Sequence, residues 1–131
     1  MNNNFICVFD METGSKNPNR CQITQIGAII LHPRSLKVVD MFNQECRLEM
    51  NEEKLAALEL DPVEEEALKV TRKTVAGLAD KPSEAMVWKQ FSLFIKKYNP
   101  STGTYKAHIP CGYNIINFDL KIVEKIGRAH V

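Results

Sequence analysis

The chain has 131 residues, of which 44% are hydrophobic, and a formal net charge of +1 at pH 7. This length suits one domain with a sizeable core, and the balanced charge excludes strong non-specific attraction to nucleic acid or membrane surfaces. No apolar run approaches the ~18 residues of a membrane helix, and the first residues contain no signal sequence. We therefore expect a cytoplasmic protein with no membrane partner. Its four cysteines lack C-x-x-C spacing, which favours reduced thiols.

The first part of the chain is predicted to form three strands, over residues 5–10, 23–32 and 36–48. A polar loop joins the first two, and residues 32–35 (His-Pro-Arg-Ser) form a turn before the third. Connections as short as these favour an antiparallel meander.

The middle of the chain is predicted to be helical. Residues 51–74 form a charged helical stretch that is broken at Asp61-Pro62, and residues 64–66 (Glu-Glu-Glu) begin its second helix. Acidic residues in a first turn suit the helix dipole, so we interpret this run as a solvated helix start.

A longer helix is predicted to begin after Ser83, which is a good N-cap. Apolar side chains then recur at helical spacing, and we interpret them as core packing and not as a base-stacking surface; they are Val87, Phe91, Ile95 and Tyr98, with Trp88 and Phe94 beside them. A strand over residues 106–111 and a further helix over 118–125 complete the pattern.

Two acidic motifs far apart in the sequence indicate the chemistry. Asp10-Met11-Glu12-Thr13-Gly14 ends the first strand, and residues 112–119 (Gly-Tyr-Asn-Ile-Ile-Asn-Phe-Asp) follow the last one. If the first strand continues to residue 12, Asp10 and Glu12 share one face. Two close carboxylates repel unless a proton or a cation lies between them, and oxygen ligands suit a hard cation such as Mg²⁺. We expect Asp10, Glu12 and Asp119 to face one cleft.

These motifs resemble those of the DEDD (DnaQ-like) 3′-to-5′ exonucleases. In that family an Asp-x-Glu ends the first strand, a strand like residues 23–30 follows, and a Gly, an aromatic residue, an Asn and then Phe-Asp begin a later helix. The resemblance extends from about Phe5 to Lys125, with Asp119 five positions after Asn114 instead of the commoner four. It implies an α/β domain with an RNase H-like mixed sheet in the order β-β-β-α-β-α.

The resemblance also implies a reaction, which is hydrolysis of single-stranded 3′ ends with two Mg²⁺ or Mn²⁺ ions. Asp10 would bridge both metals, Glu12 would hold the metal that activates water, and Asp119 would serve the second metal, largely through waters. DNA is favoured over RNA as the substrate, and a DNA polymerase is a further partner because the family includes proofreading subunits.

Three residues are implied to contact the substrate: Thr13, Asn114 and Phe118. The family assigns the backbone at the Thr13 position to the 3′-terminal nucleotide. From the residues alone, Thr13 also fits a turn cap and Asn114 a turn residue, although Phe118-Asp119 shortly after Asn114 favours a role in substrate or site support for that residue. His32 and His108 are interpreted as strand-end or core residues, because neither lies where the family places its catalytic His.

We expect residues 4–125 to be a C-terminally incomplete exonuclease domain. The family's third motif carries a fourth carboxylate preceded by a His or Tyr, whereas the only acid after Asp119 is Glu124. Residues 126–131, which include His130, match a translated sequencing-library adapter, and we interpret them as a tail without function. The chain by itself is therefore expected to have little activity.

Two alternatives remain open at the level of sequence. The first is a catalytically silent module that binds nucleic acid or docks on a polymerase. The second is a non-nuclease α/β domain whose acids are incidental, in which case Asp10, Glu12 and Asp119 would not converge.

Overall fold

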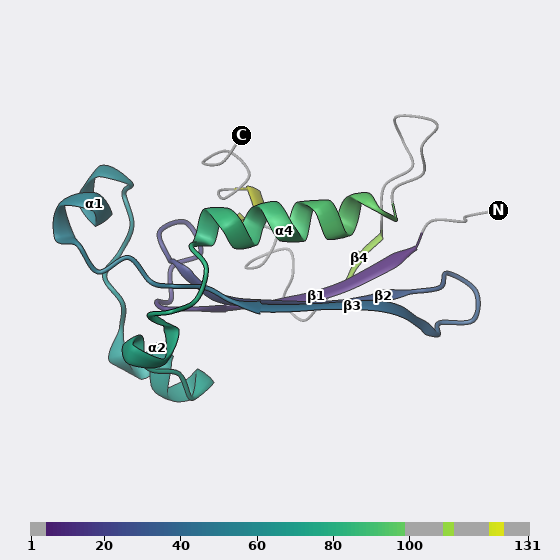
Figure 1. Ribbon diagram of the computed structural model, residues 1–131, viewed down its shortest axis with the longest axis horizontal. Coiled ribbons are helices and arrows are strands. Elements are labelled where there is room, and N and C mark those ends of the chain that lie inside the picture. The colour runs from purple at the N-terminus through teal and green to yellow at the C-terminus, as the bar shows by residue number, and fades with distance from the viewer. Residues whose placement is uncertain (1–4, 99–108, 112–120, 125–131) are drawn as a thin grey trace.

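The computed structural model describes residues 5–98, 109–111 and 121–124, and of residues 109–111 only the backbone. Figure 1 shows a sheet with one long helix lying along it. In chain order the elements are β1 (Ile6–Thr13), β2 (Ile23–Leu31), β3 (Val38–Glu45), α1 (Glu52–Ala57), α2 (Glu65–Thr71), α3 (Val75–Leu78), α4 (Glu84–Lys96) and β4 (Ile109–Cys111). Residues 121–124 are helical. Within these residues, no helix is long and apolar enough to cross a bilayer.

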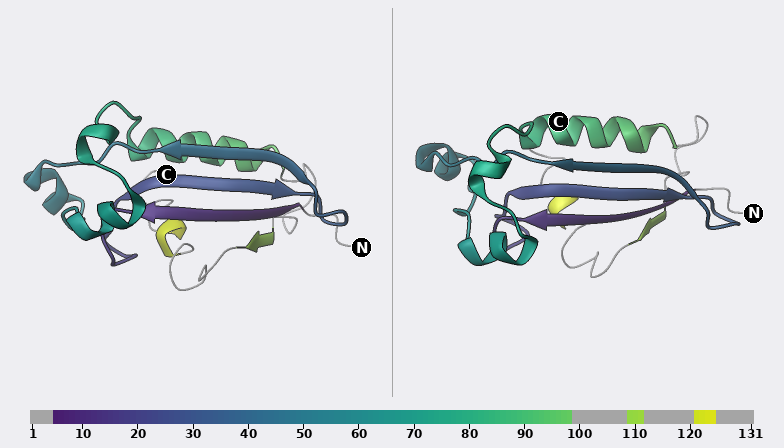
Figure 2. Two further views of the ribbon diagram at one scale, coloured as in Figure 1. Left: turned by 90° about the horizontal axis from the view of Figure 1, so that it is seen from below. Right: turned by 60° about the horizontal axis from the view of Figure 1, so that its bottom comes forward.

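The sheet has the strand order β3-β2-β1-β4. β1 pairs antiparallel with β2, and β2 with β3, while β4 joins the other edge of β1 in parallel. Figure 2 shows β4 beside β1 at this edge. The predicted meander and the predicted α/β class with a mixed sheet are both confirmed.

Two strand boundaries differ from the prediction. β1 continues past Asp10 to Thr13, because Asp10 pairs with Gly27 and Glu12 pairs with Gln25 on β2. β3 spans only residues 38–45 of the predicted 36–48, since the turn after β2 includes Leu36 in the left-handed conformation (φ 59°).

The helices follow the predicted pattern, with one addition. α1 and α2 lie on either side of the predicted break, and Glu64 is the N-cap residue of α2, which begins at Glu65. Ser83 caps α4 by accepting a hydrogen bond from the Met86 N–H, so the predicted N-cap is confirmed. The short helix α3 was not predicted; Thr74 caps it through the Gly77 N–H.

α4 and residues 121–124 cover the same face of the sheet (Figure 1). Phe91 is 2% exposed and lies between aromatic rings of β1, β3 and its own helix. The predicted core role of the α4 aromatics is therefore confirmed. The principal core cluster consists of Cys7, Phe9, Met11, Cys21, Ile23, Ile26, Ala28, Ile30, Cys46, Val87, Phe91, Phe94 and Ile122.

The buried cysteines give a first testable expectation. Burial raises the pKa of Cys7 to about 11 and that of Cys46 to about 12. In a Cys111→Ser background at pH 8 we expect very slow reaction with a thiol-specific disulfide reagent until the chain unfolds. The unfolded thiols ionise near pH 8.5, whereas the buried thiols keep their protons to a higher pH. The free energy of unfolding should therefore fall as the pH rises above about 8.5. Rapid native-state labelling of Cys46 would contradict this expectation.

Candidate metal and nucleic-acid site

The face of the sheet opposite α4, called the open face below, carries the first acidic motif. Along β1, Cys7, Phe9 and Met11 are buried against the core. Because strand side chains alternate, Asp10 and Glu12 belong to the other face. The structure therefore places the two motif carboxylates on one side of β1, with Asp10 exposed and Glu12 half-buried.

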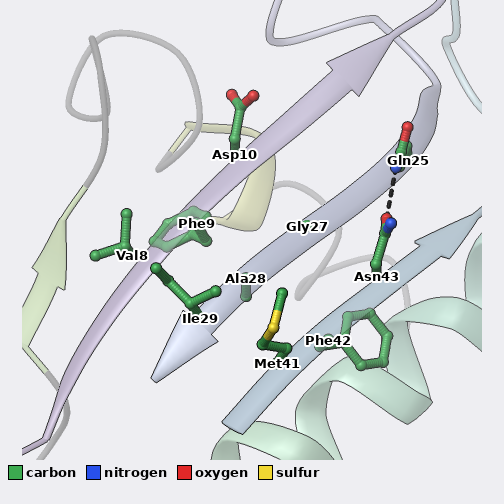
Figure 3. Close-up of a pocket in the computed structure, with 10 residues that line it drawn as sticks. All are labelled: Val8, Phe9, Asp10, Gln25, Gly27, Ala28, Ile29, Met41, Phe42 and Asn43. Atoms are coloured by element: carbon green, nitrogen blue, oxygen red, sulfur yellow. Dashed lines mark hydrogen bonds between the residues drawn. The ribbon is translucent and has the colours of Figure 1, made fainter. Parts of the chain in front are cut away.

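Three rows of side chains cross the open face from β1 to β3. They run from apolar to acidic along the strands: Val8–Ile29–Met41, Asp10–Gly27–Asn43 and Glu12–Gln25–Glu45. Figure 3 shows Asp10 standing clear of β1 at one end of the middle row. The gradation puts the carboxylates at the carboxyl end of β1, the end at which the first motif was predicted to act.

A shallow depression lies beside Asp10. Its volume is about 590 Å³, and it is lined mainly by the apolar and middle rows of the open face. Gly27 has no side chain, so the sheet surface between Asp10 and Asn43 stays low (Figure 3). The Gln25 side-chain amide donates a hydrogen bond to the Asn43 side-chain oxygen and borders the depression.

Lys73 reaches the open face from the segment between α2 and α3. Its ammonium lies 3.3 Å from Glu12 Oε2, 2.8 Å from Glu45 Oε2 and 2.6 Å from Gln25 Oε1. Burial by itself would lower the pKa of Lys73, but the bonds to Glu45 and Glu12 outweigh it and raise that pKa. Sequence reasoning missed this residue, because nothing local in the sequence connects Lys73 with a strand about fifty residues earlier.

A second depression of about 500 Å³ lies at the end of β1. Glu12, Thr13 and Ser15 line one side of it, and α2 contributes the other side with Ala67 and the 83%-exposed Val70. The Thr13 hydroxyl donates a 2.8 Å hydrogen bond to the Ser15 carbonyl, as a turn cap does. This contact occupies the side chain of Thr13 and is compatible with a substrate role for its backbone.

The other predicted site residues, Asn114, Phe118 and Asp119, lie outside the described residues. No three His, Cys, Asp or Glu side chains gather into a metal cluster within 5–98, 109–111 and 121–124. Asp10 and Glu12 nonetheless fit a hard divalent ion, because they offer carboxylate oxygens from adjacent positions on one exposed face. The third carboxylate of the predicted set is Asp119, and its convergence with the other two stays a prediction.

This architecture is similar to part of several solved exonuclease I structures. Escherichia coli exonuclease I in complex with a dA16 oligonucleotide aligns with a TM-score of 0.75 at 19% identity, over 97% of this chain and 24% of that chain. The zinc-bound form of its complex with single-stranded DNA aligns with a TM-score of 0.75 at 17% identity. A product-bound exonuclease I gives 0.73 at 19% identity, over 26% of that chain.

At identities this low, the structural similarity establishes the fold alone. This chain spans about a quarter of the length of those proteins. A comparison with protein-family models finds no match. A comparison with curated protein sequences finds none either.

Proposed function

We propose that this chain is part of a metal-dependent 3′-to-5′ exonuclease that acts on single-stranded DNA. The observation that carries the proposal is the placement of Asp10 and Glu12 on the open face of β1, with Asp10 beside the first depression and Glu12 beside the second. The structural similarity to exonuclease I, which has been solved with single-stranded DNA, supports it.

In the proposed reaction, two Mg²⁺ or Mn²⁺ ions would supply an activated water and stabilise the leaving 3′ oxygen. Asp10, which is exposed at the rim of the depression, would hold both ions, and Glu12 would hold the one nearer the water. Asp119 would complete the set. Thr13, Asn114 and Phe118 would position the terminal nucleotide, with Thr13 acting through its backbone at the second depression.

The proposed substrate is a free single-stranded end. A shallow site on a sheet face can accept one flexible strand, whereas the paired end of a duplex would have to fray first. The exonuclease I complexes contain oligonucleotides, and one contains the C-terminal peptide of SSB. They favour single-stranded DNA over a polymerase as the partner in our proposal, and proofreading is the less supported form of the activity.

The direct test is digestion of a 3′-labelled single strand with Mn²⁺. It uses the parent chain, by which we mean the proposed complete exonuclease that continues past Lys125. We expect release of the labelled 3′ nucleotide, faster from DNA than from RNA and abolished by EDTA. We also expect little turnover by the 131-residue chain, because its sequence after Asp119 offers only Glu124 as a further acid.

Two results would contradict the proposal. Metal-dependent DNA binding without any release of nucleotides would favour the catalytically silent module. Neither binding nor cleavage would favour a non-nuclease domain with incidental acids. A 5′-labelled strand is the control for direction, since 3′-to-5′ digestion shortens it progressively and does not release its label at once.

A further inference from the structure

Lys73 occupies the acidic row of the open face, Glu12–Gln25–Glu45, which takes one residue from each of the three antiparallel strands. Only 9% of its side chain is exposed, and its ammonium has an acceptor on each strand of the row. An ammonium has three N–H donors, so these three acceptors match its full capacity. Lys73 is therefore more buried and has more acceptors than the cation of an ordinary surface ion pair.

The backbone around Lys73 is fixed in a way that aims the side chain. Arg72 ends α2 in the left-handed conformation (φ 58°), and the Lys73 N–H donates to the Leu68 carbonyl at 2.9 Å. Thr74 then caps α3. Leu68 and Leu78, both buried in one small cluster, anchor the two helices. The ammonium is therefore delivered to the row by structured backbone on both sides.

Charge balance shows what the ammonium does there. Glu12 and Glu45 belong to the same row, and close carboxylates repel each other. Lys73 contacts both, and Lys81 lies 3.8 Å from the second oxygen of Glu45. Glu12 therefore has a cation on its carboxylate before any metal ion arrives.

We propose that Lys73 is an internal cation that holds Glu12 in the metal-free chain and that a divalent ion must displace from Glu12. The inference rests on the proposed function, since it takes Glu12 as a metal ligand. A divalent ion and an ammonium on one carboxylate are like charges a few ångströms apart, and they repel. The Glu12 contact, at 3.3 Å, is the longest of the three, so Lys73 can give it up and keep Gln25 and Glu45.

In this arrangement, the metal affinity of the site depends on Lys73, which lies outside both acidic motifs. The acidic row is held together without metal, at the cost of weaker binding of the ion at Glu12. Removing the charge of Lys73 should have opposite effects on two quantities: the metal-free chain becomes less stable, while its affinity for the divalent ion rises. If Lys73 had a merely structural role, its removal would lower the stability of the chain and leave its affinity for the divalent ion unchanged or weaker.

The test is Mn²⁺ binding to the 131-residue chain, measured from the free-ion signal in electron paramagnetic resonance. We expect Lys73→Met to tighten binding by roughly 10-fold or more, as removal of a nearby like charge should. Lys73→Arg keeps the charge and should bind as the original chain does. Lys81→Met is the matched control, because it removes an ammonium that contacts Glu45 and not Glu12. Melting in EDTA should show a lower midpoint for Lys73→Met.

Asp10→Asn, made in both backgrounds, separates this inference from the proposed function. Asp10-dependent binding that is tighter in Lys73→Met supports both, including the case in which only the variant binds measurably. Asp10-dependent binding that Lys73→Met leaves unchanged or weakens overturns this inference alone. If neither chain shows Asp10-dependent binding, the metal site and this inference both fail. Should Lys73→Met not fold, Lys73→Gln removes the charge while keeping a polar group, with the same expectations.

Discussion

Replacing Asp10 with Asn should reduce the Mn²⁺-dependent release of 3′ nucleotides by the parent chain at least ~100-fold. Loss of a group that only supports a metal ligand typically costs ~10–100-fold, and Asp10 is proposed to contact both ions directly. Asn keeps the size of the side chain and removes its charge. Because Asp10 is exposed on the open face, the fold should tolerate the change. The measurement is the initial rate on a 3′-labelled single strand.

Asp80→Asn provides the matched control, since Asp80 is also exposed and lies far along the chain from the acidic motifs. It should leave the rate unchanged. The Asp10 variant should also lose the rise in melting temperature that Mn²⁺ gives the original chain, because an ion that binds only the folded state stabilises it by mass action. Full activity of Asp10→Asn would remove the basis of the proposed site.

The sequence predicted those parts of the fold that depend on local pattern. The alternation of apolar residues in β1 and in β2 is visible within a few residues, and so is the N-cap at Ser83. The structure contains both strands and the cap. The common face of Asp10 and Glu12 follows from the period of a strand once β1 is known to continue past residue 10. That continuation depends on pairing with β2, which no local pattern in β1 reveals.

Features that depend on distant parts of the chain could not be predicted in this way. Lys73 meets Glu12 only because α2 packs at the end of β1, on the side of the sheet away from α4 (Figure 1). In the sequence it is one cation among many in a charged helical stretch. The short helix α3 is similar, because a single turn that is stabilised by its Thr74 cap leaves almost no periodic signal.

In our proposal, the two faces of the sheet divide the roles of stability and chemistry. On one face, α4 buries rings and aliphatic side chains against β1, β2 and β3. On the other, β1 and its neighbours present the acidic row, and Lys73 contacts all three of its residues. Changes on the open face should therefore alter metal and substrate binding with modest effects on stability, and changes under α4 should do the reverse.

The change expected to cost the most stability is Phe91→Ala. Phe91 is 2% exposed, and its ring centroid lies 5.5 Å from that of Phe42, 6.4 Å from that of Phe9 and 6.0 Å from that of Trp88. Truncating a buried Phe to Ala typically costs ~3–5 kcal/mol, through lost transfer energy and the cavity left behind. Domains of this kind are stable by only ~5–15 kcal/mol in total. The free energy of unfolding in urea measures the loss.

Leu93→Ala on the same helix is the control, because Leu93 is 57% exposed and should lose under ~1 kcal/mol. The difference between the two variants reports mainly on burial, because both introduce Ala into α4 and the helix propensities of Phe and Leu differ by less than ~0.7 kcal/mol. Neither residue faces the acidic row, so the Mn²⁺ affinity of the folded fraction should stay the same in both. Equal losses from Phe91 and Leu93 would mean that α4 does not cover the sheet in solution, and the open face could then no longer be assigned to one side.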